Sequence, residues 1–204
     1  MKSEPGLAVS YLRKGDGREL YVGVPGGRTS RVHLADDAAK GRFVTALLKA
    51  KVQADEELEL FGEPVAGLTP RSRDALRRRV GALSPIVGLV TNLNVWENIS
   101  LPAAYHGAPP LAQVARLAEE VLARFGIAPG PFLARLPDEL KILERKIAAL
   151  IRLLAAAPQL AIVDALAEGL SRAERPHTAL FEAEFAARLP GATVLYVDCT
   201  EDSE

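Results

Sequence analysis

The sequence is poor in the residues that carry redox and metal chemistry. It contains one cysteine, one methionine and three histidines in 204 residues, and aromatic residues make up only 5%. The single Cys199 excludes an internal disulfide, and the histidines lack the mutual spacing of a metal site or of a nucleophilic triad. No secretory leader pattern opens the chain. We therefore expect no metal ion bound by these residues and a reducing, cytoplasmic environment.

The sequence also lacks an excess of charge of one sign and any long hydrophobic run. Its 25 basic and 26 acidic residues give a net charge of -1, so we expect no nucleic-acid partner. The longest apolar candidate, residues 147–154, contains Arg152 and is followed by Pro158. It is far shorter than the roughly 18 apolar residues that cross a bilayer, so any membrane role must come through a partner.

What the chain does have is the composition of a soluble globular protein, with 49% hydrophobic and 25% charged residues. Its N-terminal part predicts strands at residues 7–11 and 19–24, separated by a hairpin turn at residues 14–17. A further strand at residues 29–34 leads into helical spacing over residues 38–51. A strand, turn and helix in this order is the unit in which phosphate-binding proteins place their anion site.

The middle of the chain changes to helical patterns. Thr69 and Pro70 predict the N-cap and first residue of a helix over residues 71–79, whose arginines we interpret as a solvated face. Helical segments follow over residues 85–140, the clearest at residues 111–125. We interpret residues 85–140 as an inserted helical subdomain.

The C-terminal part predicts a long helix over residues 139–156 and two almost wholly apolar runs, residues 160–164 and 193–197. Such runs are typical of parallel strands that are covered on both faces. Residues 176–189 predict a helix between them, so strand, helix and strand complete a right-handed crossover. The first run ends in Asp164, which we expect at the C-terminal end of a central strand.

These patterns predict an α/β fold with a mainly parallel sheet, N-terminal antiparallel strands and an inserted helical subdomain. We expect one domain over residues 1–204. Its core is assigned to residues 1–84 and 141–204.

The segment from Asn92 to Pro102, NLNVWENISLP, resembles the stretch that follows the glutamine loop in the ATP-binding cassettes of ABC transporters. Weaker matches lie in the same register. They are Leu60-Phe61-Gly62, the letters GLTPRSR, Val80-Gly81 at the next strand, the letters LPDEL before a long helix, and Gly169-Leu170 after the strand that ends in Asp164. The resemblance covers nearly the whole chain and implies a P-loop NTPase-like core.

In this register Lys40 takes the place of the lysine that contacts phosphate in the family motif GxxxxGK[ST]. The glycines that let such a loop wrap phosphates are replaced by Leu34, Asp37 and Ala39, and Gly41 lacks the hydroxyl that ligates magnesium. Asp36 and Asp37 would place two negative charges beside a triphosphate. We interpret the two aspartates as helix-capping residues and Lys40 as a solvated side chain.

Other family positions are changed as well. Pro85 stands at the glutamine of the glutamine loop, and Ser171 replaces an aspartate after Gly169-Leu170. The signature motif LSGGE is replaced by LKILE at residues 140–144, which we interpret as part of a continuous helix. The bulk of Ile142 and Leu143 is expected to block a close approach of backbone to phosphate.

Four more positions concern the nucleotide directly. Asp164 matches the magnesium aspartate, or alternatively caps the following turn. The general-base position is Ala165 and the switch histidine is Cys199, which we interpret as a small buried residue. Tyr11 lies roughly where an aromatic ring stacks on adenine, with packing within a strand as the alternative.

Three functions remain open from the sequence. The favoured one is a catalytically degenerate cassette, a pseudo-ATPase that docks on an ABC permease or a second ATPase subunit at the inner face of the membrane and needs no cofactor. The first alternative is a working ATPase that uses ATP and magnesium for transport; the second is a small-ligand module that reuses the cleft. Trp96 is expected to anchor either the helical subdomain or an interface. The transported substrate cannot be deduced, because the resemblance implies that specificity resides in other subunits.

Overall fold

The computed structural model describes residues 6–15, 18–107 and 109–199. The hairpin turn expected at residues 14–17 lies partly outside these residues. The chain divides into two compact units. The sheet unit comprises Met1–Ala82, Pro158–Ala165 and Gly191–Glu204, and the helical unit comprises Leu83–Ala157 and Leu166–Pro190.

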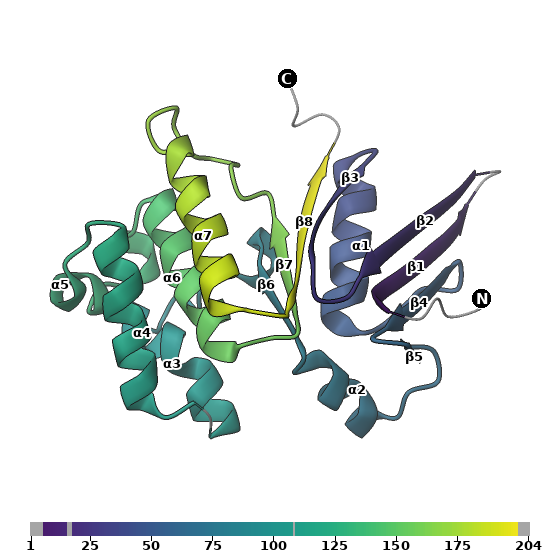
Figure 1. The fold of residues 1–204 in the computed structure, drawn as a ribbon, viewed down its shortest axis with the longest axis horizontal. Helices are drawn as coiled ribbons and strands as arrows, with labels where there is room; N and C mark the ends of the chain where they lie inside the picture. The colour runs from purple at the N-terminus through teal and green to yellow at the C-terminus, as the bar shows by residue number, and fades with distance from the viewer. Residues whose placement is uncertain (1–5, 16–17, 108, 200–204) are drawn as a thin grey trace. The chain divides into compact units, whose positions relative to one another are not determined.

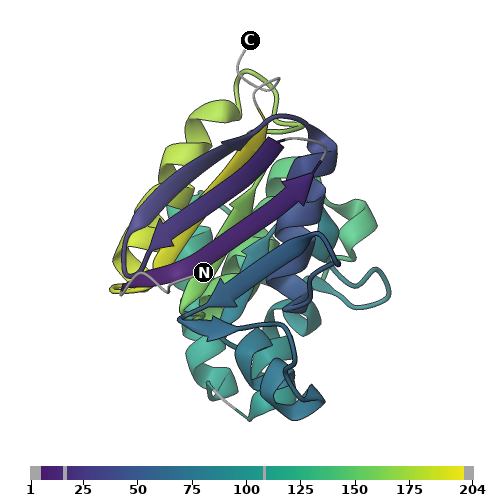
Figure 2. The ribbon, with the colours of Figure 1, turned by 90° about the vertical axis from the view of Figure 1, so that its right-hand side faces the viewer.

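The sheet unit opens with an antiparallel sheet in the order β2-β1-β4-β5 (Figure 2, purple to blue strands). Its strands are β1 Leu7–Gly15, β2 Arg18–Pro25, β4 Glu56–Leu60 and β5 Glu63–Pro64. The central strand β1 pairs antiparallel with both β2 and β4. Burial alternates along β4, as expected for a sheet with one covered face. The predicted N-terminal antiparallel strands are confirmed.

A second sheet has the order β3-β8-β7-β6 (Figure 1). It consists of β3 Thr29–Leu34, β8 Thr193–Cys199, β7 Leu160–Asp164 and β6 Val80–Leu83. β8 pairs in parallel with β3 on one side and β7 on the other. Every residue of β7 is buried, because its apolar side chains face covered surfaces on both sides of the sheet. The prediction that Asp164 ends a central parallel strand beside residues 193–197 is confirmed.

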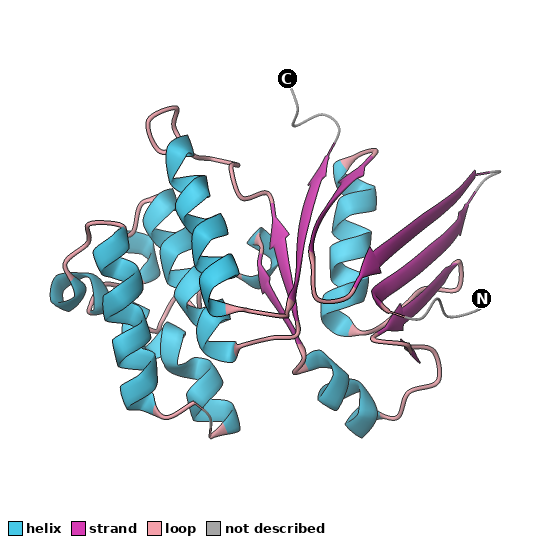
Figure 3. Cartoon of the chain, in the orientation of Figure 1, coloured by secondary structure: helices cyan, strands magenta, loops and turns pink. Residues whose placement is uncertain are grey.

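Helix α1, Asp37–Lys49, lies between the two sheets of this unit and contacts β3, β8 and β4 (Figure 3). Its apolar stripe, which includes the fully buried Phe43, Val44 and Leu47, fills the space between them. The shorter α2, Pro70–Arg77, begins as expected, since Thr69 Oγ1 accepts a hydrogen bond from Ser72 N and proline occupies the first turn.

The helical unit is built around α6, Ile142–Ala156, which contacts α3, α4 and α7. The other elements are η1 Pro85–Val87, α3 Val95–His106, α4 Leu111–Arg124, α5 Pro129–Leu133, η2 Pro137–Glu139, η3 Arg175–His177 and α7 Thr178–Arg188. Helices α6 and α7 make most of their contacts within this unit and therefore belong to it. The helical unit is therefore larger than the expected subdomain of residues 85–140, because it also contains residues 83–84, 141–157 and 166–190, which the sequence patterns assigned to the core.

The segment NLNVWEN forms the start of α3. Asn94 Oδ1 accepts from Glu97 N, and Glu97 Oε2 accepts from Asn94 N, both at 2.8 Å, so the two residues cap the helix reciprocally. Asn98 is fully buried, and its side-chain amide bonds both the N–H and the carbonyl of Val90 and the carbonyl of Leu93. Two asparagines and one glutamate of this motif, Asn94, Asn98 and Glu97, are thus explained by local hydrogen bonds.

Within the described part of the chain, no helix is both long enough and apolar enough to cross a membrane. The parallel sheet, the antiparallel sheet and the helices together confirm the predicted α/β class with a P-loop NTPase-like core.

Candidate functional site

The connection from β3 to α1 stands where the phosphate loop was expected, and it is short. Only Ala35 and Asp36 lie between the strand and the helix. Asp36 is extended, with φ -155° and ψ 169°, and its Oδ1 accepts from Ala39 N at 2.7 Å as the N-cap. The capping role expected for Asp36 is confirmed. Because α1 begins at Asp37, residues 37–39 are already in the first helical turn and leave only Ala35 and Asp36 in the connection, too few to form an anion-binding loop.

Lys40 is buried, with 10% of its side chain exposed. Its Nζ lies 3.1 Å from Asp37 Oδ1 and 3.7 Å from Asp164 Oδ1. The expectation of a solvated lysine is therefore wrong. The physical reason is the early helix start, which places Lys40 one turn into α1, on the face toward the carboxyl end of β7.

The carboxylate of Asp37 supplies the negative charge at this place. Its Oδ1 accepts from Cys199 Sγ, also at 3.1 Å, so one oxygen meets two donors. The hydrogen bond from Cys199, followed by that from Lys40, holds the pKa of Asp37 below its ordinary value. Burial alone would lower the pKa of Lys40, but the hydrogen bond to Asp37 and the charge of Asp164 raise it overall. A carboxylate of the chain itself thus holds the Lys40 ammonium.

Sequence reasoning missed Asp37 as a partner, although a signal was available. Asp37 and Lys40 are spaced three apart, which puts their side chains on one face of a helix. The hydrogen bond between Cys199 and Asp37 could not be predicted from sequence spacing, because it joins the end of β8 to α1. The interpretation of Cys199 as a buried residue is confirmed, with 1% exposed.

Asp164 and Ala165 lie at the carboxyl end of β7, beside Lys40. The side chain of Asp164 is 6% exposed. Ala165 is buried, has φ 53°, and its N–H donates to Val197 O at 3.4 Å. Its methyl group has no oxygen with which to orient a water, so this position offers no general base.

Tyr11 lies in the core of the sheet unit. Its ring is 1% exposed and packs edge to face against Phe43, with centroids 5.0 Å apart. Its hydroxyl donates to Glu56 Oε1 at 2.9 Å, and burial together with this bond raises the pKa of Tyr11 above its ordinary value. Such a ring presents no face to a base. The adenine-stacking position is contradicted, and the alternative of packing within a strand is confirmed.

In the helical unit, the segment at residues 140–144 forms the start of α6. The helix begins at Ile142, so the expectation of a continuous helix through these residues is wrong. The cause is Glu144, whose Oε2 accepts from Lys141 N at 2.8 Å and whose Oε1 pairs with Arg135 at 2.9 Å. Ile142 is 45% exposed. The positive end of the helix therefore meets the chain's own carboxylate and carries a bulky apolar side chain.

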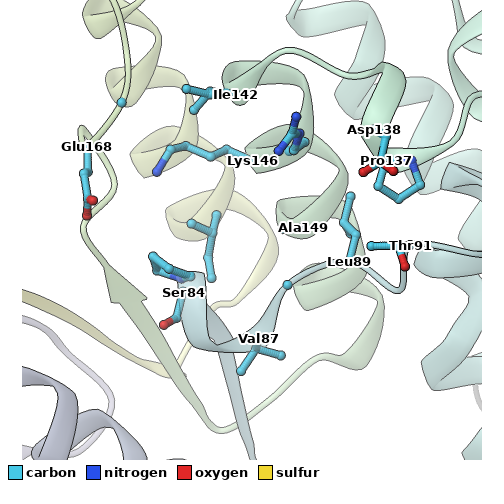
Figure 4. A pocket seen from close by; sticks show the side chains of 15 residues that line it. Ser84, Val87, Leu89, Thr91, Pro137, Asp138, Ile142, Lys146, Ala149 and Glu168 are labelled. Carbon is cyan, nitrogen blue, oxygen red and sulfur yellow. The ribbon is translucent and has the colours of Figure 1, made fainter.

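A cavity of about 410 Å³ lies beside this segment, within the helical unit (Figure 4). Val87 and Leu89 line it from the segment after β6, and Ile142, Lys146 and Ala149 line it from α6. The loop that carries Val87 is tied to α6, because the Arg152 guanidinium donates to the carbonyls of Val87 and Gly88. The exposed Pro85 also lines the cavity and has no side-chain acceptor to offer a metal.

A magnesium nucleotide does not fit the residues at the β3–α1 connection. The Lys40 ammonium is already held by carboxylates, the wrapping residues are helical, and Gly41 brings no hydroxyl. Among the described residues no group of three or more His, Cys, Asp and Glu side chains is placed to hold a metal ion.

Comparison with known proteins gives similarity in structure rather than in sequence. No protein-family model and no curated protein matches the sequence. A solved structure of CbiO1 from Clostridium perfringens, described as part of the ABC transporter complex CbiONQ, superposes with a TM-score of 0.73. The match has 15% identity and covers 97% of this chain and 80% of that one.

The ATP-binding cassette MJ0796, solved as a dimer in a post-hydrolysis state bound to ADP and Pi, gives a TM-score of 0.62. Here the identity is 17%, and the match covers 95% of this chain and 87% of that one. Both matches follow the chain over nearly its whole length, as the resemblance in the sequence predicts. The chain therefore has the fold of the ATP-binding cassettes of ABC transporters.

Proposed function

We propose that this chain is a catalytically degenerate cassette, a subunit that keeps the shape of an ABC ATPase without hydrolysing ATP itself. The observation that carries the proposal is the pairing of Lys40 with Asp37 and Asp164. An ATP molecule would have to displace two carboxylates from the lysine before its phosphates gained a contact, and it would face the like charge that remains.

The other changes point in the same direction. Hydrolysis needs donors aimed at the developing charge of the transition state, each contributing about 10²-fold or more. The helical residues at the β3–α1 connection and the capped start of α6 offer no such donors, and Ala165 offers no general base to activate a water. A working ATPase, the first alternative, would have to compensate all of them together, so we expect neither ATP nor magnesium as a cofactor.

The proposed role is docking on a permease or on a catalytically complete cassette, peripheral to the inner face of the membrane. The CbiO1 structure is described as part of an ABC transporter complex, which supports an assembly of this general kind. The reciprocally capped start of α3 supports it too, because residues 92–97 present a well-ordered surface whose shape needs no nucleotide. Trp96, half-buried at this start, is available in part for contact.

The first experiment is calorimetric titration of the purified full chain with ATP, with and without magnesium, beside a phosphate-release assay. We expect no binding heat and no release above that of the Lys40→Ala variant, which reports contaminating ATPases. Saturable binding with turnover that Lys40→Ala abolishes would establish the working ATPase instead.

The second experiment is recovery of partners from detergent-solubilised membranes. We expect a permease or a complete cassette, and we expect Asn92→Arg to weaken recovery without lowering the melting temperature, since Asn92 is exposed. The matched control is Gln113→Arg, an exposed position on α4 with the same change of charge. Isolation of the chain alone, under conditions that preserve membrane complexes, would contradict the docking role.

A further inference from the structure

Four exposed cations lie on or directly after two neighbouring helices of the sheet unit, and we call them the basic patch. They are Lys49 and Lys51 at the C-terminal end of α1, and Arg71 and Arg78 on and just after α2. None of the four forms an ion pair with a carboxylate in the part of the chain that the structure describes.

Two other arginines of the same segment have structural roles, and one of them connects α2 to the end of α1. Arg73 donates from Nε to Ala50 O at 3.2 Å and from Nη2 to Leu68 O at 3.3 Å. Because Ala50 caps the C-terminus of α1, this fixes α2 against the end of that helix (Figure 1). Arg79 lies over the Phe61 ring, 4.0 Å from its centroid, and pairs with Glu63.

Folding explains only part of the patch. The helix dipole favours cations at a helix C-terminus, which accounts for Lys49, Lys51 and Arg78, and for Arg77, itself paired with Asp74 at 3.6 Å. It does not account for Arg71, which lies in the first turn of α2, where the dipole disfavours a cation. A local excess of positive charge in a chain of net charge -1 is unfavourable through self-repulsion unless an anionic surface faces it.

We infer that the basic patch holds the chain against the anionic headgroups of a membrane surface. Clusters of four to eight lysines and arginines, on a helix or beside a membrane segment, are typical of protein segments that bind anionic lipid headgroups. The four cations line none of the cavities of about 410, 480 and 550 Å³ in the two units, and an acidic peptide would need a groove to fix its backbone. Lipid headgroups are mobile and adapt to the spacing of cations on an open surface.

The composition of α2 further restricts the class of anionic partner that the basic patch can bind. The helix has no aromatic side chain on which a base could stack, which disfavours single-stranded nucleic acid. Its one buried apolar residue, Leu76, faces the protein, so the helix has no exposed apolar face to insert into a bilayer. The contact is therefore electrostatic and lies on the surface. This inference goes beyond the docking role and does not depend on it, because it needs neither nucleotide nor partner.

The test is sedimentation of the full chain with vesicles of phosphatidylcholine alone and with roughly 30% phosphatidylglycerol added. We expect binding to the anionic vesicles only, lost at high salt and unchanged by ATP. The variant Arg71→Gln/Arg78→Gln should lower the partition coefficient about 30-fold, since each basic residue near the surface contributes on the order of 1 kcal/mol. Both side chains are exposed, and circular dichroism confirms that the variant folds.

The matched control is Arg116→Gln/Arg172→Gln, which removes the same charge from exposed positions of the helical unit. It should change the partition coefficient less than threefold, a difference below about 1 kcal/mol. Equal loss in both variants would reduce the effect to net charge and overturn the inference. So would equal binding to neutral vesicles, or patch-dependent binding of polyglutamate or of an oligonucleotide without binding of anionic vesicles.

Discussion

At the scale of single residues, the burial of Lys40 makes it a structural residue. We expect Lys40→Ala to lower the free energy of unfolding by about 3 kcal/mol, because it leaves the buried Asp164 carboxylate without that cation. Urea unfolding followed by circular dichroism measures the loss. Lys49→Ala, an exposed lysine on the same helix, is the control and should change it by less than about 0.5 kcal/mol. An unchanged midpoint in Lys40→Ala would mean that the lysine is solvated after all.

The same cluster predicts a pH dependence whose sign follows from the two pKa shifts. The pKa of Asp37 is lowered in the folded chain, so its stabilisation is complete above the unfolded pKa of about 4 and is lost as the pH falls through the folded value. The pKa of Lys40 is raised, so its stabilisation is complete below about 10.4 and is lost as the pH rises through the folded value.

The measurement is the difference in unfolding free energy between the wild type and Asp37→Asn across pH. It should be flat through the neutral range and shrink toward both extremes. Asp74→Asn, at an exposed aspartate on α2, is the comparison and should give a smaller difference at neutral pH. A difference for Asp37→Asn that grows on acidification would contradict the assigned pairing.

At the scale of elements, the end of α6 offers a stabilising substitution. Ala157 caps this helix in the left-handed region, with φ 44° and ψ 56°, where a Cβ is unfavourable. We expect Ala157→Gly to stabilise the chain by about 0.5 to 1 kcal/mol. Its neighbour Ala156, equally exposed but helical, is the matched control, and Ala156→Gly should destabilise by a similar amount. Thermal unfolding distinguishes the two, and a shift of the same sign in both would refute the assigned conformations.

The start of α3 depends on one buried amide. Asn98→Ala removes the partners of Val90 N–H and of the Val90 and Leu93 carbonyls, so we expect a loss of about 3 kcal/mol. Asn92→Ala, three residues before the helix and exposed, should cost less than about 0.5 kcal/mol. Denaturant midpoints compare the two variants, and near-equal values would show that the amide network is dispensable.

The elements also show where sequence reasoning succeeds. The wholly apolar runs at β7 and β8 could be assigned because a buried parallel strand has no polar face to mask its pattern. The N-cap at Thr69 was likewise local and predictable. The start of α6 was not, because strong helix formers continue through residues 140–141 and only the Glu144 side chain decides where the helix begins. At the site, residue types alone indicated that the family's loop glycines, magnesium hydroxyl and general base are replaced. The burial of Lys40 and Tyr11 could not be predicted in this way, because it depends on contacts distant in sequence.

At the scale of the whole molecule, the proposed absence of nucleotide binding predicts a melting temperature that is insensitive to ATP. A ligand present at about 100 times its dissociation constant stabilises the folded state by about 2.7 kcal/mol. We expect the melting temperature to be the same with and without millimolar magnesium ATP, beyond the effect of matched magnesium chloride and sodium sulfate. A rise that saturates with ATP concentration would show that a nucleotide site persists somewhere in the chain.

The first turn of α1 sets the evolutionary course open to this protein. A cassette that has lost one catalytic side chain can regain it by a single codon change. Here each glycine returned to the loop would cost about 1 kcal/mol in a helix that is already formed, and removal of the Asp36 cap would cost about as much again. On the proposed degenerate role, such changes lower the stability of the chain before they bring any affinity for nucleotide. We therefore expect related sequences that share this first turn to vary at residues 34–41 as the rest of a protein core varies.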